Sequence, residues 1–263
     1  MRARSRFLPA VAILLVSCPL AAQQASTTVA EILAQVQLNA GQFVRSLPDF
    51  VCDERVTSRG THKGKVTQVV IESHFVGLQK KSGRMSYTET REINTVNGQP
   101  ARKGQRFQGP FLFGGGFSSI LNQTFSPIFV PSHTYKIAGE EMLRETDTLV
   151  MEFATKEGQK ELYFDYFGKA VVQKDTGKAW IDKGSLQVLK LERHYLNVQK
   201  GESPMLATVE YGEVRIDGKP FWMPSRVSAQ QTFKGGDTGE YLAEYSNYRK
   251  FEVSSGIVFT ENQ

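Results

Sequence analysis

The spacing of apolar residues changes at Pro48, and this change constrains the fold more than any other feature. Before Pro48, apolar residues between Val29 and Leu47 recur at intervals of three and four, which places them on one face of a helix. After it they alternate with polar residues, as at Leu149, Met151 and Phe153, which is typical of antiparallel strands with one buried face. Because the helix carries an apolar stripe and the rest of the chain predicts sheet, we expect the sheet to cover the helix.

The sequence also contains signals for both ends of this helix. Thr28 and Glu31 have the spacing of a capping box, in which each side chain accepts a hydrogen bond from the other residue's backbone N–H. Pro48 disfavours helical geometry in the residue before it, which predicts the C-terminal end. A helix of roughly 20 residues would be about 30 Å long.

The remainder predicts roughly ten strands joined by tight turns. The turn signals are Asn97-Gly98, Asp175-Thr176-Gly177, Lys183-Gly184 and Asp217-Gly218. No linker or internal repeat divides the chain, so we expect one mainly β, α+β domain over residues 23–263.

One strand contains a change of phase. Met205, Ala207, Val209 and Tyr211 share one alternation, whereas Val214 and Ile216 follow the other. An extra residue in a β-bulge would restore the inward direction, so we predict a bulge or a sharp bend at Gly212.

The first 22 residues have the composition of a signal peptide. Arg2, Arg4 and Arg6 precede the apolar run Phe7–Val16, and small residues follow as far as Ala22. The run is too short to span a bilayer, and no later stretch approaches the roughly 20 residues required. We therefore expect an exported, periplasmic protein with no transmembrane helix after residue 22.

The two cysteines each have two interpretations. Leu15-Val16-Ser17-Cys18 resembles a lipobox, which would make Cys18 a lipidated anchor, whereas Leu20-Ala21-Ala22 offers an ordinary cleavage site. Without Cys18, Cys52 has no partner for an internal disulfide. Cys52 is then either a small buried side chain beside Phe50 or a reactive thiol.

Charge argues against nucleic acid as a partner. Without Arg2, Arg4 and Arg6, the 32 lysines and arginines become 29, against 27 acidic residues. Nucleic-acid binding requires a concentrated basic face. The richest basic runs are short, and we interpret them as solvated turns: Lys63 with Lys65, and Lys80 with Lys81 and Arg84.

The sequence contains no recognisable catalytic or metal-binding motif, so we expect neither an enzyme nor a cofactor. Of the histidines, His74 shares a strand face with Glu72, but a metal site needs three or four ligands. His194 follows Glu192 and Arg193 on what we interpret as a charged strand face. The carboxylates of Asp165, Asp175 and Asp182 are interpreted as solvated groups at strand ends and turns.

Apolar surface is more abundant than a thin sheet over one helix needs. The aromatic residues responsible are Tyr163, Phe164, Tyr166, Phe167, Phe221 and Trp222. The segment 105–131 breaks the strand pattern, and its Gly114-Gly115-Gly116 run favours a hinge or plug over an anion cradle, because no lysine accompanies it. The interior of such a sheet is either filled with side chains or open to an apolar ligand.

Several segments resemble the outer-membrane lipoprotein-sorting carriers, the LolA/LolB-like group. They are Gly177–Asp182 with the turn and strand to Leu191, Phe221-Trp222-Met223-Pro224, and Tyr245–Phe251. The resemblance implies a large curved antiparallel sheet, a half-open barrel, wrapped over the N-terminal amphipathic helix and holding acyl chains in its interior.

Three hypotheses of function follow. The first is an envelope protein that binds a lipid, a lipoprotein acyl chain or another apolar ligand, with Val36, Phe43, Phe111, Phe113 and Phe117 in contact with it and the last three in a mobile lid. The second is a structural or interaction module with a filled core and an envelope protein as partner. The third is a hydrolase, which requires Glu72, His74, Asp165 or Asp182 to converge in a cleft.

Overall fold

A computed structural model describes residues 28–79, 87–114, 116–159, 163–166, 169–172, 174–196 and 202–252. The proposed signal peptide, Cys18 and the Lys80–Arg84 turn lie outside these residues. The elements of the described chain are α1 (Val29–Ser46), β1 (Phe50–His62), β2 (Lys65–Gln79), β3 (Tyr87–Val96), β4 (Gln99–Pro100), α2 (Ser119–Phe125), η1 (Val130–Ser132), β5 (His133–Leu143), β6 (Thr146–Thr155), β7 (Tyr163–Tyr166), β8 (Lys169–Val172), β9 (Asp175–Asp182), β10 (Val188–Tyr195), β11 (Met205–Ile216), β12 (Lys219–Thr232) and β13 (Thr238–Lys250).

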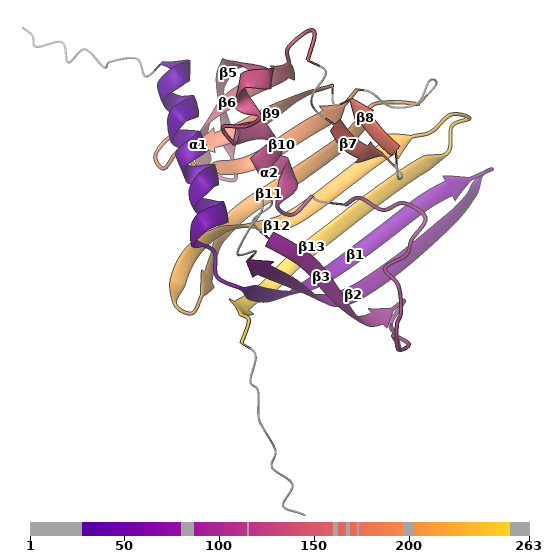
Figure 1. The fold of residues 1–263 in the computed structure, drawn as a ribbon. Helices are drawn as coiled ribbons and strands as arrows, with labels where there is room; N and C mark the ends of the chain where they lie inside the picture. Colours follow the sequence, from indigo (N-terminus) through magenta and orange to yellow (C-terminus); the bar gives the residue numbers. More distant parts are fainter. Residues whose placement is uncertain are drawn as a thin grey trace, which may run out of the picture.

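Eleven strands form one antiparallel sheet, and β7 and β8 form a separate hairpin. The order in the large sheet is β4-β3-β2-β1-β13-β12-β11-β10-β9-β6-β5, so the first strand pairs with the last. The sheet is curved and open, and α1 and α2 lie on the same side of it (Figure 1). The expected mainly β fold, a curved antiparallel sheet with an N-terminal helix, is confirmed, although the estimate of roughly ten strands was too low.

Helix α1 has the predicted ends. The Glu31 carboxylate accepts a hydrogen bond from the backbone N–H of Thr28 at 2.7 Å, and the Thr28 hydroxyl accepts one from the N–H of Glu31 at 3.3 Å. Leu47, before Pro48, is already extended. Within the described residues, no helix is long and apolar enough to cross a bilayer.

Two of the predicted hairpin turns have the positive φ angles that such turns require. They are Asn97-Gly98, with φ of 50° and 75°, and Asp217-Gly218, with 52° and 74°. A turn also follows Asp182, but its positive φ belongs to Leu186 rather than to Gly184.

The prediction of a turn at Asp175-Thr176-Gly177 was wrong, because these residues begin strand β9. Gly177 is required for a different reason. A Cβ there would lie 2.3 Å from the Phe153 ring and 2.1 Å from the Glu192 carbonyl oxygen, so glycine allows close packing rather than a turn.

The predicted irregularity near Gly212 is present, one residue earlier. The pairing of β11 with β12 shifts between Glu210, opposite Arg226, and Tyr211, opposite Pro224. The extra residue is Ser225, so the bulge lies on the partner strand β12 rather than at Gly212 itself.

The concave face of the sheet is covered by three segments. Helix α1 packs mainly against α2 and reaches the sheet at β12 and β5. The irregular segment between β4 and α2 crosses the same side of the sheet (Figure 1). The apolar core lies between these segments and the sheet, and includes Val36 of α1 and Ile120 of α2.

The outer face carries a row of alternating charges along one cross-strand line. The paired residues, from β10 through β11, β12, β13 and β1 to β2, are Lys190, Glu210, Arg226, Glu244, Arg55 and Glu72. Opposite charges on neighbouring strands attract, so this surface neutralises itself.

Candidate ligand-binding face

The concave face near β1, β2 and β13 is aromatic. The Phe117 ring, from the covering segment, lies 4.6 Å from the Phe75 ring, 5.0 Å from the Tyr245 ring and 5.6 Å from the Phe50 ring, measured between ring centroids. All four rings are almost fully buried. A side chain from the cover thus occupies the centre of the apolar face.

Phe111 fixes the covering segment between β4 and α2 to the sheet. Its backbone N–H donates a hydrogen bond to the Ser58 hydroxyl at 3.0 Å, and the same hydroxyl donates to the Phe111 carbonyl. The Phe111 ring fits against Gly239, where a Cβ would lie only 2.5 Å away. This close packing makes Phe111 an anchor of the covering segment.

Phe113 is held more loosely. Its ring is half-buried, 6.3 Å from the Tyr241 ring and 6.5 Å from the Tyr195 ring. These distances are near the outer limit for aromatic pairs. The cover therefore has a firm part at Phe111 and a looser part at Phe113.

Two buried charge clusters lie on the same concave side. In the first, Arg91 donates two hydrogen bonds to the Glu54 carboxylate, at 2.6 and 2.9 Å, and the Ser73 hydroxyl donates a third at 2.9 Å. The guanidinium lies between the rings of Phe75 and Phe107. Burial alone would lower the pKa of Arg91, but its pairing with Glu54 outweighs burial and raises it.

The second cluster centres on Asp175 of β9. Its carboxylate accepts hydrogen bonds from His133, at 2.9 Å, from Thr155 and from the Nε of Arg193. The side chains of His133, Asp175 and Arg193 are all 0% exposed. Burial alone would raise the pKa of Asp175, but the hydrogen bonds from His133 and Thr155 and the charge of Arg193 lower it, so the group is ionised.

This second cluster joins the cover to the sheet. The Nη1 of Arg193 donates to the side-chain oxygen of Gln123 in α2, at 2.9 Å. The Nδ1 of His133 lies 3.0 Å from the Phe129 carbonyl oxygen, just before η1. The position of α2 on the sheet therefore depends partly on buried charge.

The structure places the predicted ligand-contacting residues unevenly. Val36, Phe111 and Phe117 are buried on the concave side, and Phe113 is half-buried there. The Phe43 side chain lies outside the description. Their contact with a ligand stays a prediction. Cys52 is fully buried, as its interpretation as a small core residue predicts, and burial raises the pKa of its thiol.

Sequence reasoning missed the Asp175 cluster. Asp175 is buried rather than solvated, and Arg193 points to the opposite face from His194, because neighbouring strand residues alternate. His133 and Asp175 are 42 residues apart in the chain. The one available signal was a polar residue, Arg193, at an inward position between Leu191 and Tyr195.

The residues of the hydrolase hypothesis do not converge. Glu72 pairs with Arg55 and His74 with Asp53, both on β2 and β1. Asp182, on β9, accepts from the backbone N–H groups of its own turn. Five strands separate β2 from β9, and the Asp165 side chain lies outside the description. Among the described residues, no three potential ligands are grouped for a metal ion.

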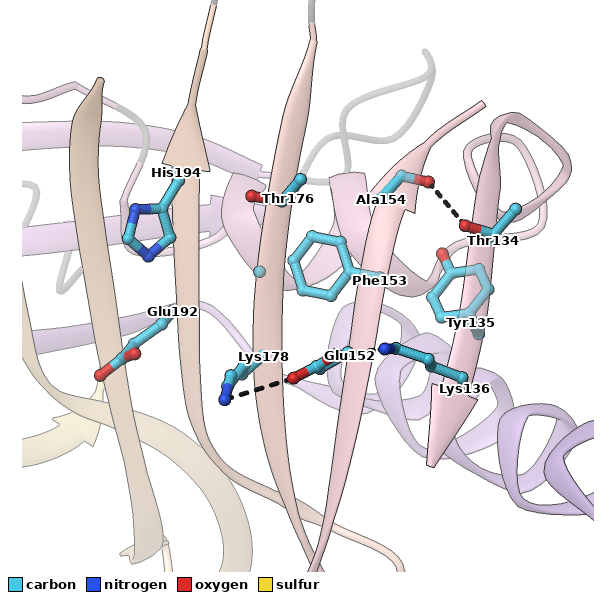
Figure 2. Close-up of a pocket in the computed structure, with 11 residues that line it drawn as sticks. Thr134, Tyr135, Lys136, Glu152, Phe153, Ala154, Thr176, Lys178, Glu192 and His194 are labelled. Carbon is cyan, nitrogen blue, oxygen red and sulfur yellow. Dashed lines mark hydrogen bonds and ion pairs between the residues drawn. The ribbon is translucent and has the colours of Figure 1, made fainter. Parts of the chain in front are cut away.

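A groove of about 450 Å³ lies over β5, β6, β9 and β10 (Figure 2). Its charged groups are already paired, because Glu152 contacts Lys136 at 2.8 Å and Lys178 at 3.3 Å. Thr134, Thr176 and His194 line its other side (Figure 2). Such ion pairs are typical of a solvated sheet surface, so we prefer the concave face as the functional site.

No protein-family model and no curated protein sequence matches this chain. Several solved structures are similar in fold at 11–13% sequence identity. A DUF1329 family protein from Desulfovibrio piger has a TM-score of 0.38 and covers 89% of this chain and 97% of its own. A LolA superfamily protein from Nitrosomonas europaea has a TM-score of 0.36, with coverages of 84% and 94%.

The Mycobacterium tuberculosis lipoprotein LppX has a TM-score of 0.30, with coverages of 84% and 96%. Because these scores are low, the proposal below is supported by the concave face of this chain alone.

Proposed function

We propose that this chain is an exported carrier that binds an acyl chain between the concave face of its sheet and a cover formed by residues 101–114, residues 116–118 and α2. The observation that carries this proposal is the site of Phe117. An apolar side chain from an irregular segment fills the centre of an aromatic surface built by regular strands. A ligand of similar polarity can replace it there.

The energetics favour such an exchange. Burying each CH₂ group of an acyl chain contributes about 0.8 kcal/mol, so a long chain compensates for the displaced Phe113 and Phe117 rings. Phe111, held by Ser58 and Gly239, would remain in place as the hinge. The exchange needs no catalytic step and no cofactor, and we assign neither.

The main test is extraction of the native protein. We expect organic solvent to recover a lipid in molar proportion to protein purified from its own envelope, identified by mass spectrometry. Protein purified through the same steps after delipidation serves as the control. If native preparations contain no lipid and the delipidated protein binds no fluorescent acyl probe, the proposal fails.

A second experiment tests displacement of the cover. The Phe113→Trp variant carries a reporter on the looser part of the cover, and we expect its emission to shift when acyl probe is added. The matched control is Met142→Trp, at an exposed position of β5. Equal shifts at both positions would mean that the probe binds the surface without moving the cover.

The alternative is an envelope interaction module with a permanently filled core. The close packing of Phe111 and Phe117 favours it, because neither ring leaves obvious space. This alternative predicts recovery of a protein partner, an unchanged Phe113→Trp emission and no bound lipid.

A further inference from the structure

His133 is held between two hydrogen-bond acceptors. Its Nδ1 is 3.0 Å from the Phe129 carbonyl oxygen and its Nε2 is 2.9 Å from the Asp175 carboxylate. His133 thus bridges the segment before η1 and the Asp175 carboxylate.

The Arg193 guanidinium is incompletely paired. It shares the Asp175 carboxylate with His133 in a site whose side chains are 0% exposed. In addition, the Nη2 of Arg193 is buried and finds no hydrogen-bond partner among the residues that the structure describes. A buried charged group without its partners is costly, so a built cluster of this kind points to a missing anion.

The cluster adjoins the looser part of the cover. The Arg193 guanidinium lies 5.2 Å from the Tyr195 ring, and the same ring lies 6.5 Å from Phe113. A chain that displaced Phe113 would therefore come against Tyr195, with its end near Arg193. Gln123 of α2 already accepts from the same guanidinium and would border this end.

We propose that Arg193 binds the acidic group of the ligand, a carboxylate or a phosphate, at the end of its acyl chain. This inference rests on the proposed function and adds the chemical class of the ligand. The anion would accept from the Nη2 of Arg193, which has no partner among the described residues. Charge-assisted hydrogen bonds of this kind are among the strongest in proteins.

The test uses the full-length mature protein after delipidation, at neutral pH. Binding of oleate, oleyl phosphate and the uncharged methyl oleate is measured by displacement of the fluorescent acyl probe. We expect at least one acid to bind about tenfold or more tightly than the ester, because the ester lacks the charge. The stronger of the two acids identifies carboxylate or phosphate as the natural group.

The Arg193→Gln variant tests whether the preference for an acid over the ester depends on Arg193. We expect it to lose about tenfold affinity for the preferred acid while keeping its affinity for methyl oleate. The matched control is Arg226→Gln, an exposed arginine of the outer-face row, which should change neither. Thermal melting checks the fold of each variant, and if Arg193→Gln does not fold, the comparison of headgroups on the wild-type protein decides.

Different failures have different meanings. Equal binding of acids and ester by the wild-type protein, or a preference that survives in folded Arg193→Gln, overturns the acidic-group site and leaves the carrier proposal intact. Failure of all three ligands to bind overturns the carrier proposal itself.

Discussion

Arg91 and Arg193 both lie on the concave side of one sheet, but their surroundings differ. Arg91 does not share the Glu54 carboxylate with a second described cation, and it donates two hydrogen bonds to it. Its guanidinium lies over the Phe75 and Phe107 rings. Arg193 shares Asp175 with His133 and keeps one buried nitrogen without a partner among the described residues.

This comparison distinguishes an ion pair that only stabilises the fold from one that can also bind a ligand. The Glu54–Arg91 pair is neutral and complete, so it can only hold β1, β2 and β3 in register. The Asp175 cluster also holds elements together, but it is left with unused donor capacity. A complete pair indicates structure, whereas an incomplete one in a built site indicates a ligand.

The largest effect should come from Asp175→Asn. This change leaves the buried Arg193 guanidinium without its carboxylate, so we expect a loss of about 3–5 kcal/mol in the free energy of unfolding at neutral pH. Urea denaturation measures it. Because the pKa of Asp175 is lowered in the folded protein, its contribution is fully present above the pKa of an unfolded aspartate, about 4, and is lost as pH falls below that value.

The pH series supplies the control for this prediction. The difference in the free energy of unfolding between wild type and Asp175→Asn should decrease steadily as the pH falls below about 4. A difference that stays constant from neutral pH to strongly acidic pH would contradict the assignment of Asp175 as an ionised buried group.

A smaller loss, about 3 kcal/mol, should follow Arg91→Met, because the buried Glu54 carboxylate that is left keeps its hydrogen bond from Ser73. The double variant Glu54→Gln with Arg91→Met should recover most of that loss, since no unpaired charge remains. The exposed pair Arg55–Glu72 offers the matched control. Arg55→Met should cost no more than about 1 kcal/mol.

The stability of the double variant, compared with that of the single variant, tests whether the Glu54–Arg91 pair has a purely structural role. If the double variant were as unstable as the single one, the Glu54–Arg91 region would not behave as a self-contained pair, and the contrast with Asp175 would weaken.

The smallest effect, with the opposite sign, should come from Tyr211→Phe. The Tyr211 hydroxyl is buried without a hydrogen-bond partner among the described residues, and burial raises its pKa. Removing it should stabilise the delipidated protein by up to about 1 kcal/mol. Chemical denaturation with and without oleate measures the change, and a destabilisation would show that the hydroxyl has a partner.

Much of the fold could be predicted from sequence because local signals determine it. The capping box at Thr28, the proline after Leu47 and the glycine turns at 98 and 218 each act within four residues of chain. The alternation of Tyr241, Ala243 and Tyr245 likewise reports one buried face.

The functional site could not be predicted in the same way, because distant residues build it. Asp175-Thr176-Gly177 has the composition of a turn, and only the Phe153 ring from a neighbouring strand explains its glycine. The partners of the Asp175 carboxylate, His133 and Arg193, come from two other strands. Nothing local distinguishes that aspartate from a solvated one.

The alternating charges on the outer face have a consequence for folding. Glu244 lies opposite Arg55 in the native pairing of β13 with β1. A slip of one residue would turn the apolar side chains to water, and a slip of two residues in one direction would set Glu244 against Asp53, carboxylate against carboxylate. Strands β1 and β13 are far apart in the sequence and must pair in one register. Repulsion between like charges in this row would destabilise a misaligned pairing before the core is closed.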